Sequence, residues 1–224
     1  MKFKKYYFSV IFTMILILVS GLSFADEKRY KKAKKYKVTI TNLTRGQVFS
    51  HPIAIGHDGK FRLFTVGKEA SVELAVLAEE GDTGPLEGLI YGRYPSVVFD
   101  GPIPPGATAS AMVEMGRFRL ISVAGMLVGT NDALFAAHDV WLLGKRKTTV
   151  MVPAYDAGSE INSEDCQDIP GPPCVNGSNL HPADDPSDYV HIHAGIHGIK
   201  DVNPAADYDW RNPVALIKIQ RIYY

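Results

Sequence analysis

The chain has 224 residues, with 24 Lys and Arg against 24 Asp and Glu, so its formal net charge at pH 7 is zero. This length suits one domain with a sizeable hydrophobic core and is rather small for two. The N-terminus predicts export from the cytoplasm, which excludes nucleic acid as a partner.

A secretory signal peptide is predicted over residues 1–25. Lysines at the very start precede an apolar run over residues 8–22, and residues 23–25 (Ser-Phe-Ala) carry small side chains at the two positions that determine cleavage. The apolar run is short for the roughly 20 residues that span a bilayer. We therefore expect cleavage before Asp26, a mature chain without a transmembrane segment, and a secreted or periplasmic location.

Residues 26–35 form a basic lead-in, in which most side chains are Lys or Arg. A basic arm of this kind can bind anionic lipid or polyanionic glycans. A solvated, disordered segment ahead of the first strand explains the same composition. Both interpretations stay open.

Residues 36–224 are predicted to form one all-β domain. Short runs of alternating apolar and polar residues are separated by turn signals, and they predict strands at 36–44, 48–56, 59–67, 108–115, 117–126, 147–155, 188–196 and 214–222, with another after Asp132. Residues 68–80 combine helix formers with an apolar stripe and predict one helix that ends at Gly81. Residues 81–105 and 156–187 are predicted as loops. Many short strands in one domain indicate an antiparallel β-sandwich with one short helix and long loops.

The two cysteines lie in the second long loop, as Cys166 and Cys174. An exported chain meets an oxidising compartment, so these two residues are predicted to form a local disulfide. A metal site built on cysteine needs further ligands close by, and a reactive thiol is more often single. The expected role is to hold an irregular loop in place.

Two acidic clusters flank two consecutive strand-like segments. Asn131 and Asp132 precede the first segment, and Asp156 and Glu160 follow the second. If the segments are neighbouring antiparallel strands, the clusters meet at one end of a sheet and offer several oxygen atoms to a hard cation such as calcium. The alternative is that these residues only make turns and cap strands.

His191 and His193 are the candidates for a second kind of metal site. On a strand they project from the same face, and imidazole suits copper and zinc. Secreted copper/zinc superoxide dismutases use a similar His-x-His, so a copper- or zinc-dependent oxidoreductase is the competing function. We find no second His-x-His in the sequence. A half-buried strand with its histidines bonded to nearby loops is the alternative.

Four motifs occur in the order TNDALFAAHDVWLL, VPAYDAGSEINSE, HIHAGIHG and DWRNPVALIKI, from residue 130 to residue 219. Together they resemble the spondin N-terminal domain in its bacterial secreted form. That family is similar to synaptotagmin-type calcium-binding sandwiches, and its animal members belong to extracellular-matrix and cell-adhesion proteins. The resemblance implies a calcium site at Asp132, Asp156 and Glu160, with Asn131 as a weaker candidate, and it implies no catalysis.

The last motif also gives expectations for Trp210 and Arg211. We expect Trp210 to pack over an edge of the core and Arg211 to pair with an acidic residue. A tryptophan that stacks on a ligand is the alternative.

The sequence as a whole predicts a calcium-binding module that acts in binding or adhesion outside the cytoplasm. Its partner would be a surface protein, a glycan or anionic lipid. The sequence has no Gly-x-Ser-x-Gly motif, and Ser122 and Ser163 lack a local context that would activate a nucleophile.

Overall fold

A computed structural model of the chain describes residues 34–142, 146–175, 188–202 and 204–223. The predicted signal peptide and residues 26–33 of the basic lead-in lie outside the described residues. In the described part of the chain, no helix is both long enough and apolar enough to cross a membrane.

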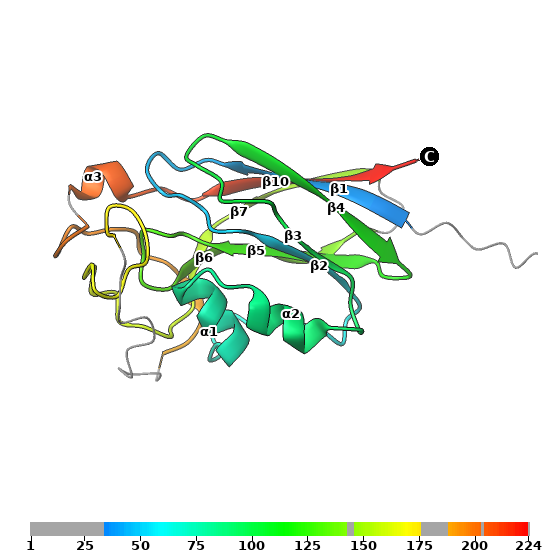
Figure 1. Cartoon of the computed structure of the whole chain (residues 1–224), viewed down its shortest axis with the longest axis horizontal. Coiled ribbons are helices and arrows are strands. Elements are labelled where there is room, and N and C mark those ends of the chain that lie inside the picture. Colours follow the sequence, from blue (N-terminus) through cyan, green and yellow to red (C-terminus); the bar gives the residue numbers. More distant parts are fainter. Residues whose placement is uncertain (1–33, 143–145, 176–187, 203, 224) are drawn as a thin grey trace, which may run out of the picture. The chain divides into compact units, whose positions relative to one another are not determined.

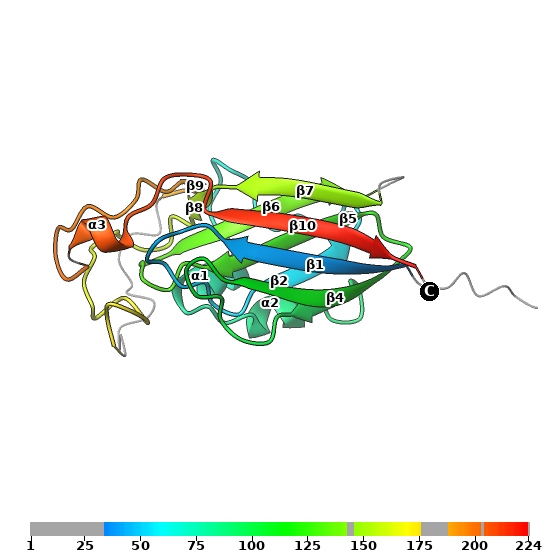
Figure 2. The same ribbon diagram turned by 90° about the horizontal axis from the view of Figure 1, so that it is seen from above.

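Two antiparallel sheets form a sandwich, which confirms the predicted all-β fold (Figures 1 and 2). The four-stranded sheet has the order β4-β1-β10-β7, and the six-stranded sheet has the order β3-β2-β5-β6-β8-β9. The strands are β1 (Lys34–Asn42), β2 (Ile53–His57), β3 (Ser96–Val98), β4 (Thr108–Gly116), β5 (Leu120–Met126), β6 (Ala133–Trp141), β7 (Lys147–Val152), β8 (Ala154–Asp156), β9 (His191–Ile192) and β10 (Ala215–Ile222).

The main hydrophobic core lies between the two sheets. Alternate residues of each strand point inward, so Val38 and Ile40 of β1 are fully buried beside Ile219 and Ile217 of β10. From the facing sheet, Phe135 of β6 is also fully buried and belongs to the same cluster. The apolar residues that alternate along the predicted strands are therefore the residues that form this core.

A smaller cluster covers the outer face of the six-stranded sheet. Helices α1 (Val72–Glu79) and α2 (Gly84–Ile90) lie on that face (Figure 1). The predicted helix is shorter than expected, because Ser71 caps its N-terminus by accepting a hydrogen bond from the Leu74 N–H at 3.3 Å. Gly81, with a φ of +69°, follows its end as expected.

Two predictions within this region were wrong. Residues 59–67 form turns instead of a strand, because Phe61, Leu63 and Phe64 bury their side chains in the outer cluster without pairing to a neighbouring strand. The chain also has more than one helix: α2 lies in a segment predicted as loop, and the short α3 (Ala205–Tyr208) follows later. Helix α2 contains two glycines, which lower its helix propensity, so the sequence did not predict it. It nevertheless buries Leu86 and Ile90.

The segment predicted as one strand at 147–155 is divided between the two sheets. Residues up to Val152 form β7 and pair with β10, whereas β8 begins at Ala154 and pairs with β6. Pro153 lies between them and has no N–H to donate to a ladder. The change of sheet brings Asp156, at the end of β8, beside the start of β6.

Candidate functional site

The acidic clusters meet where β6 begins and β8 ends. Ala133 is the register partner of Asp156, so the residue before Ala133, Asp132, lies next to Asp156. The backbone N–H of Ala157 also donates to the Asp132 carbonyl at 3.1 Å. Asp132 and Asp156 are 0 % and 1 % exposed. The structure therefore places two buried acids close together, near enough for the charge of Asp156 to act on Asp132.

Asp132 has one oxygen that is well bonded and one that is not. Its Oδ2 accepts hydrogen bonds from the N–H groups of Ser159 at 2.8 Å and Glu160 at 3.1 Å. Its Oδ1 is buried and has no hydrogen-bond partner in the described part of the chain. Burial, together with the nearby charge of Asp156, raises the pKa of Asp132 to about 7. A buried acceptor without a donor is costly unless a proton or a cation occupies it.

Asp156 is held by the loop that follows it. Its Oδ1 accepts from the Gly158 N–H at 2.8 Å, and its Oδ2 accepts from the Asn162 side-chain amide at 2.7 Å. Gly158 has a φ of +67°, and a Cβ there would lie 2.7 Å from the backbone nitrogen of Tyr189. The turn around Asp156 therefore requires glycine for both conformation and space.

His193 is joined to Asp156 through Asn162. Because the Asn162 amide nitrogen donates to Asp156, its Oδ1 accepts from His193 Nε2 at 3.0 Å. The other ring nitrogen, Nδ1, accepts from the Gly195 N–H at 2.9 Å. Both nitrogens of His193 are therefore in use in the neutral ring. Burial lowers its pKa, which favours this neutral form.

His191 is arranged differently and is more exposed. Its Nδ1 lies 2.8 Å from the carbonyl of Tyr189, which can only accept, so Nδ1 carries the proton. Its Nε2 lies 3.8 Å from Asp156 Oδ2, and His193 Nε2 lies 3.9 Å from the same oxygen. The two histidines thus converge on one carboxylate, as the strand alternation predicts.

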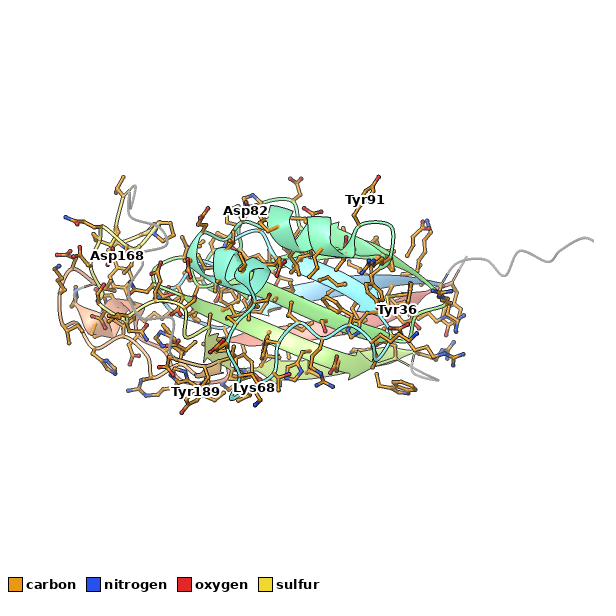
Figure 3. All side chains as sticks on the ribbon, turned by 90° about the horizontal axis from the view of Figure 1, so that it is seen from below. Tyr36, Lys68, Asp82, Tyr91, Asp168 and Tyr189 are labelled. Atoms are coloured by element: carbon orange, nitrogen blue, oxygen red, sulfur yellow. A yellow bond between two sulfur atoms is a disulfide. The ribbon has the colours of Figure 1, made fainter. Side chains whose placement is uncertain are left out.

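The segment that carries His191 is fixed against the loop before α1. The Gly67 N–H donates to the Val190 carbonyl at 2.8 Å, and the Val190 N–H donates to the Lys68 carbonyl at 2.9 Å. Lys68 and Tyr189 consequently lie side by side (Figure 3).

Asn131 ties the first cluster to the loop after β8. Its side-chain amide donates to Glu160 Oε2 and to Ser163 Oγ, both at 3.3 Å. Its Oδ1 accepts from the Glu164 N–H at 3.2 Å. All four sequence-predicted residues therefore gather in one region, but Asn131 and Glu160 bond to each other there.

Glu164 was missed by the sequence analysis. It is 3 % exposed and has a φ of +53°, which is uncommon for a residue other than glycine. Its two carboxylate oxygens accept from the N–H groups of His197 at 2.6 Å and Ile199 at 2.8 Å. Glu164 therefore anchors the loop after β8 to the segment after β9. Its nearness to Asp156 in the sequence is the only signal that points to it.

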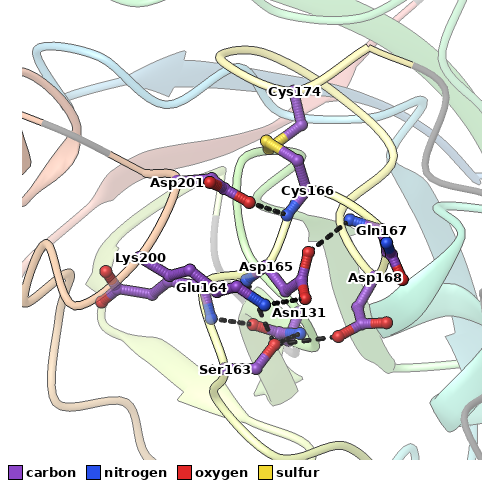
Figure 4. The surroundings of a disulfide bond; sticks show 10 residues. All are labelled: Asn131, Ser163, Glu164, Asp165, Cys166, Gln167, Asp168, Cys174, Lys200 and Asp201. Carbon is purple, nitrogen blue, oxygen red and sulfur yellow. Dashed lines mark hydrogen bonds and ion pairs between the residues drawn. A yellow bond between two sulfur atoms is a disulfide. The ribbon is translucent and has the colours of Figure 1, made fainter.

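Cys166 and Cys174 form the predicted disulfide (Figure 4). Beside it, the Cys166 N–H donates to Asp201 at 3.0 Å, and Lys200 pairs with Asp165. The bridge thus belongs to the same assembly of loops as Glu164.

A pocket of about 520 Å³ lies next to this assembly. We call it the Trp210 pocket; it is lined by His193, Ile196, His197, Asp209, Trp210 and Arg211. As expected, Trp210 packs into the core and Arg211 pairs with an acid, Asp209. The Trp210 ring lies 5.1 Å from that of His193, so the pocket shares a wall with the acidic site.

The residues fit a hard cation only in part. Within the described residues, no group of three or more His, Cys, Asp or Glu side chains has the arrangement of a formed metal site. Asp132 Oδ1, which has no hydrogen-bond partner among the described residues, nevertheless offers a buried carboxylate oxygen near a second carboxylate, which is the ligand chemistry of calcium.

Comparison with known proteins assigns no family to the chain. No family model matches it, and no curated protein matches it significantly. The likeness to the spondin N-terminal domain therefore stays a prediction from the four sequence motifs.

Proposed function

We propose that this protein is a secreted or periplasmic calcium-binding β-sandwich that acts as a binding or adhesion module. The observation that carries the proposal is the carboxylate of Asp132, whose Oδ1 is buried near Asp156 and has no hydrogen-bond partner among the described residues. Two buried carboxylates repel each other when both are charged. A calcium ion between them offsets that repulsion and supplies the missing partner of Oδ1.

The surrounding loops suit a cation that orders a binding surface. Asp132 bonds to the backbone at residues 159 and 160, so a cation held by Asp132 also stabilises this loop. From Asp156, a separate chain of hydrogen bonds runs through Asn162 to His193, which lines the Trp210 pocket. We infer that calcium fixes the shape of this pocket and its rim. The partner would be a surface protein, a glycan or anionic lipid.

The disulfide supports a location outside the cytoplasm, because such bonds persist in oxidising compartments. It also restrains the irregular loop beside the acidic site. An exported module that meets calcium outside the cell is consistent with both features.

A copper- or zinc-dependent oxidoreductase is the second candidate. It draws on the convergence of His191 and His193 on Asp156 Oδ2. However, both nitrogens of His193 already have partners, so a transition metal would have to displace Asn162. Calcium requires no such displacement at Asp132 Oδ1, and we favour it for that reason.

Metal analysis of the purified protein separates the two candidates. Elemental analysis should find calcium and no stoichiometric copper or zinc. After removal of metal with a chelator, calorimetric titration should give one calcium ion per chain, and Asp132→Asn should weaken binding at least about tenfold. Asp100→Asn is the matched control, since Asp100 is exposed and lies outside the acidic site. Stoichiometric zinc or copper with no calcium binding would reverse the assignment.

A further inference from the structure

A second pocket, of about 330 Å³, lies at the other end of β6 from Asp132. We call it the hairpin pocket, because the turn between β4 and β5 forms one side of it. Leu120 of β5 is paired with His57 of β2 on one side and with Trp141 of β6 on the other. Residues paired directly across strands share a face of the sheet. Leu120 is therefore the floor, and His57 and Trp141 stand beside it.

The wall at His57 is held by a buried pair, His57 and Ser122, which are 0 % and 1 % exposed. His57 Nδ1 lies 2.9 Å from the carbonyl of Asp58, so this nitrogen donates. His57 Nε2 then accepts from the Ser122 hydroxyl at 2.9 Å. Ser122 is thus a buried structural partner, in line with the absence of a nucleophile context in the sequence. The pair fixes the His57 ring, so this wall of the pocket is preformed.

Two aromatic side chains provide the apolar walls. Trp141 is 49 % exposed, which is unusual for a tryptophan at the end of a core strand. Phe118 is half-buried, with its ring 5.4 Å from that of Tyr94. In a concave site, the exposed flat face of Trp141 beside the partly covered Phe118 ring favours a flat apolar ligand.

Among the described residues, two arginines and one acid line the hairpin pocket: Arg117, Arg119 and Asp58. Asp58 accepts from the Lys60 N–H at 3.0 Å, a bond that lowers its pKa, and the charge of Arg117 lowers it further. Arg117 also lies over the Phe118 ring at 5.1 Å. Arg119 forms no ion pair with any residue that the structure describes, and it is exposed. Arg117 is engaged with the Phe118 ring and the charge of Asp58, so the exposed Arg119 guanidinium is the group placed to hold a single carboxylate.

We propose that the hairpin pocket binds a small aromatic monocarboxylate, with the carboxylate on Arg119 and the ring between Trp141 and Phe118. The volume is at the lower end of the range for small-molecule sites, which limits the ligand to one or two rings. The site is separate from the acidic loops and does not depend on calcium.

The test compares two probes with the same naphthalene ring, 2-naphthoate with a carboxylate and 2-naphthylmethanol with a neutral hydroxymethyl group, by calorimetric titration of the purified protein. We expect 2-naphthoate to bind about tenfold more tightly than the alcohol, as for one charge-assisted contact. Arg119→Gln should remove this difference and leave binding of the alcohol unchanged. Arg119→Lys should keep part of it, and Trp141→Ala should weaken both probes. Arg45→Gln is the control, since Arg45 is exposed but pairs with Asp207 elsewhere.

Three outcomes would overturn the proposal. The first is that the wild-type protein binds the two probes with equal affinity, and the second is that it does not bind 2-naphthoate at millimolar concentration. The third is that Arg119→Gln and Arg45→Gln weaken the binding of 2-naphthoate by the same factor. Circular dichroism of each variant confirms that the fold is intact, and Arg119→Lys serves if the glutamine variant is unfolded.

Discussion

The buried carboxylate of Asp132 lies beside that of Asp156, and the charge of Asp156 contributes to raising the pKa of Asp132 to about 7. One oxygen of Asp132 holds the loop after β8, while the other has no partner in the described part of the chain. Near neutral pH, a proton would therefore compete with the proposed calcium ion for this position. This competition makes pH and calcium the two variables with which the site is best examined.

Without calcium, the stability of the protein should decrease between about pH 4 and pH 7. The pKa of Asp132 is raised in the folded state from 3.8 to about 7, so the folded protein keeps a proton that the unfolded chain has lost. The stabilisation that comes from Asp132 is therefore fully present below its pKa in the unfolded chain. It is lost as the pH rises through its pKa in the folded protein. His193, whose pKa is lowered by burial, acts in the opposite direction.

Calorimetry of calcium-free protein and of Asp132→Asn across this interval measures the effect. The variant should lack the part of the decrease that comes from Asp132, whereas Asp100→Asn should behave as the wild type does. An unchanged pH profile in Asp132→Asn would contradict the assignment of the raised pKa.

Gly158→Ala should destabilise the protein more than the same change at Gly92. The two glycines have nearly the same φ, +67° and +68°, so both variants incur a similar backbone cost of roughly 1 kcal/mol. A Cβ at residue 158 would also meet the backbone of Tyr189, whereas nothing lies within 4 Å at residue 92. Urea denaturation should therefore give a clearly larger loss for Gly158→Ala. Equal losses would mean that the close approach to Tyr189 has no energetic weight.

Asn162→Ala should remove the link between Asp156 and His193. Two hydrogen bonds are lost, one of them to a carboxylate, but Asn162 is exposed and water can replace part of both. We expect a loss of about 1 kcal/mol in the free energy of unfolding. The His193 pKa, followed by NMR, should also change. Gln167→Ala, an exposed position in the same loop, is the control and should have little effect on either quantity.

Replacing both cysteines by serine should cost roughly 2 to 3 kcal/mol, because the bond between Cys166 and Cys174 closes a short loop. Denaturant unfolding of the double variant measures this. Since Glu164 anchors the neighbouring loop through its own hydrogen bonds, the secondary structure of the sandwich should persist. Loss of the whole β-sheet signal would show that the bridge is needed for the fold itself.

The strands of the sandwich could be predicted because one face of each strand packs against the core, so that apolar and polar residues alternate along the sequence. The same alternation was misleading at Phe61 and Leu63, which pack onto the helix layer without pairing in a sheet. Sequence alone could not distinguish these cases, since both bury every second side chain.

The meeting of Asp132 and Asp156 could be predicted from two consecutive strands, although the true partner strand is β8 and not the whole of the predicted segment. The links made by Asn162 and Glu164 could not be predicted from the sequence. Each joins residues about thirty positions apart through side-chain geometry that leaves no periodic signal.

The most direct test of the calcium assignment is a thermal melt of metal-stripped protein with calcium added from micromolar to millimolar concentration. A ligand that binds only the folded state stabilises it by about 2.7 kcal/mol at 100 times its Kd. We predict that the melting temperature rises with calcium and falls again with chelator, that Asp132→Asn and Asp156→Asn lose the response, and that Asp100→Asn keeps it. A melting curve that does not change over this range of calcium would contradict the proposal.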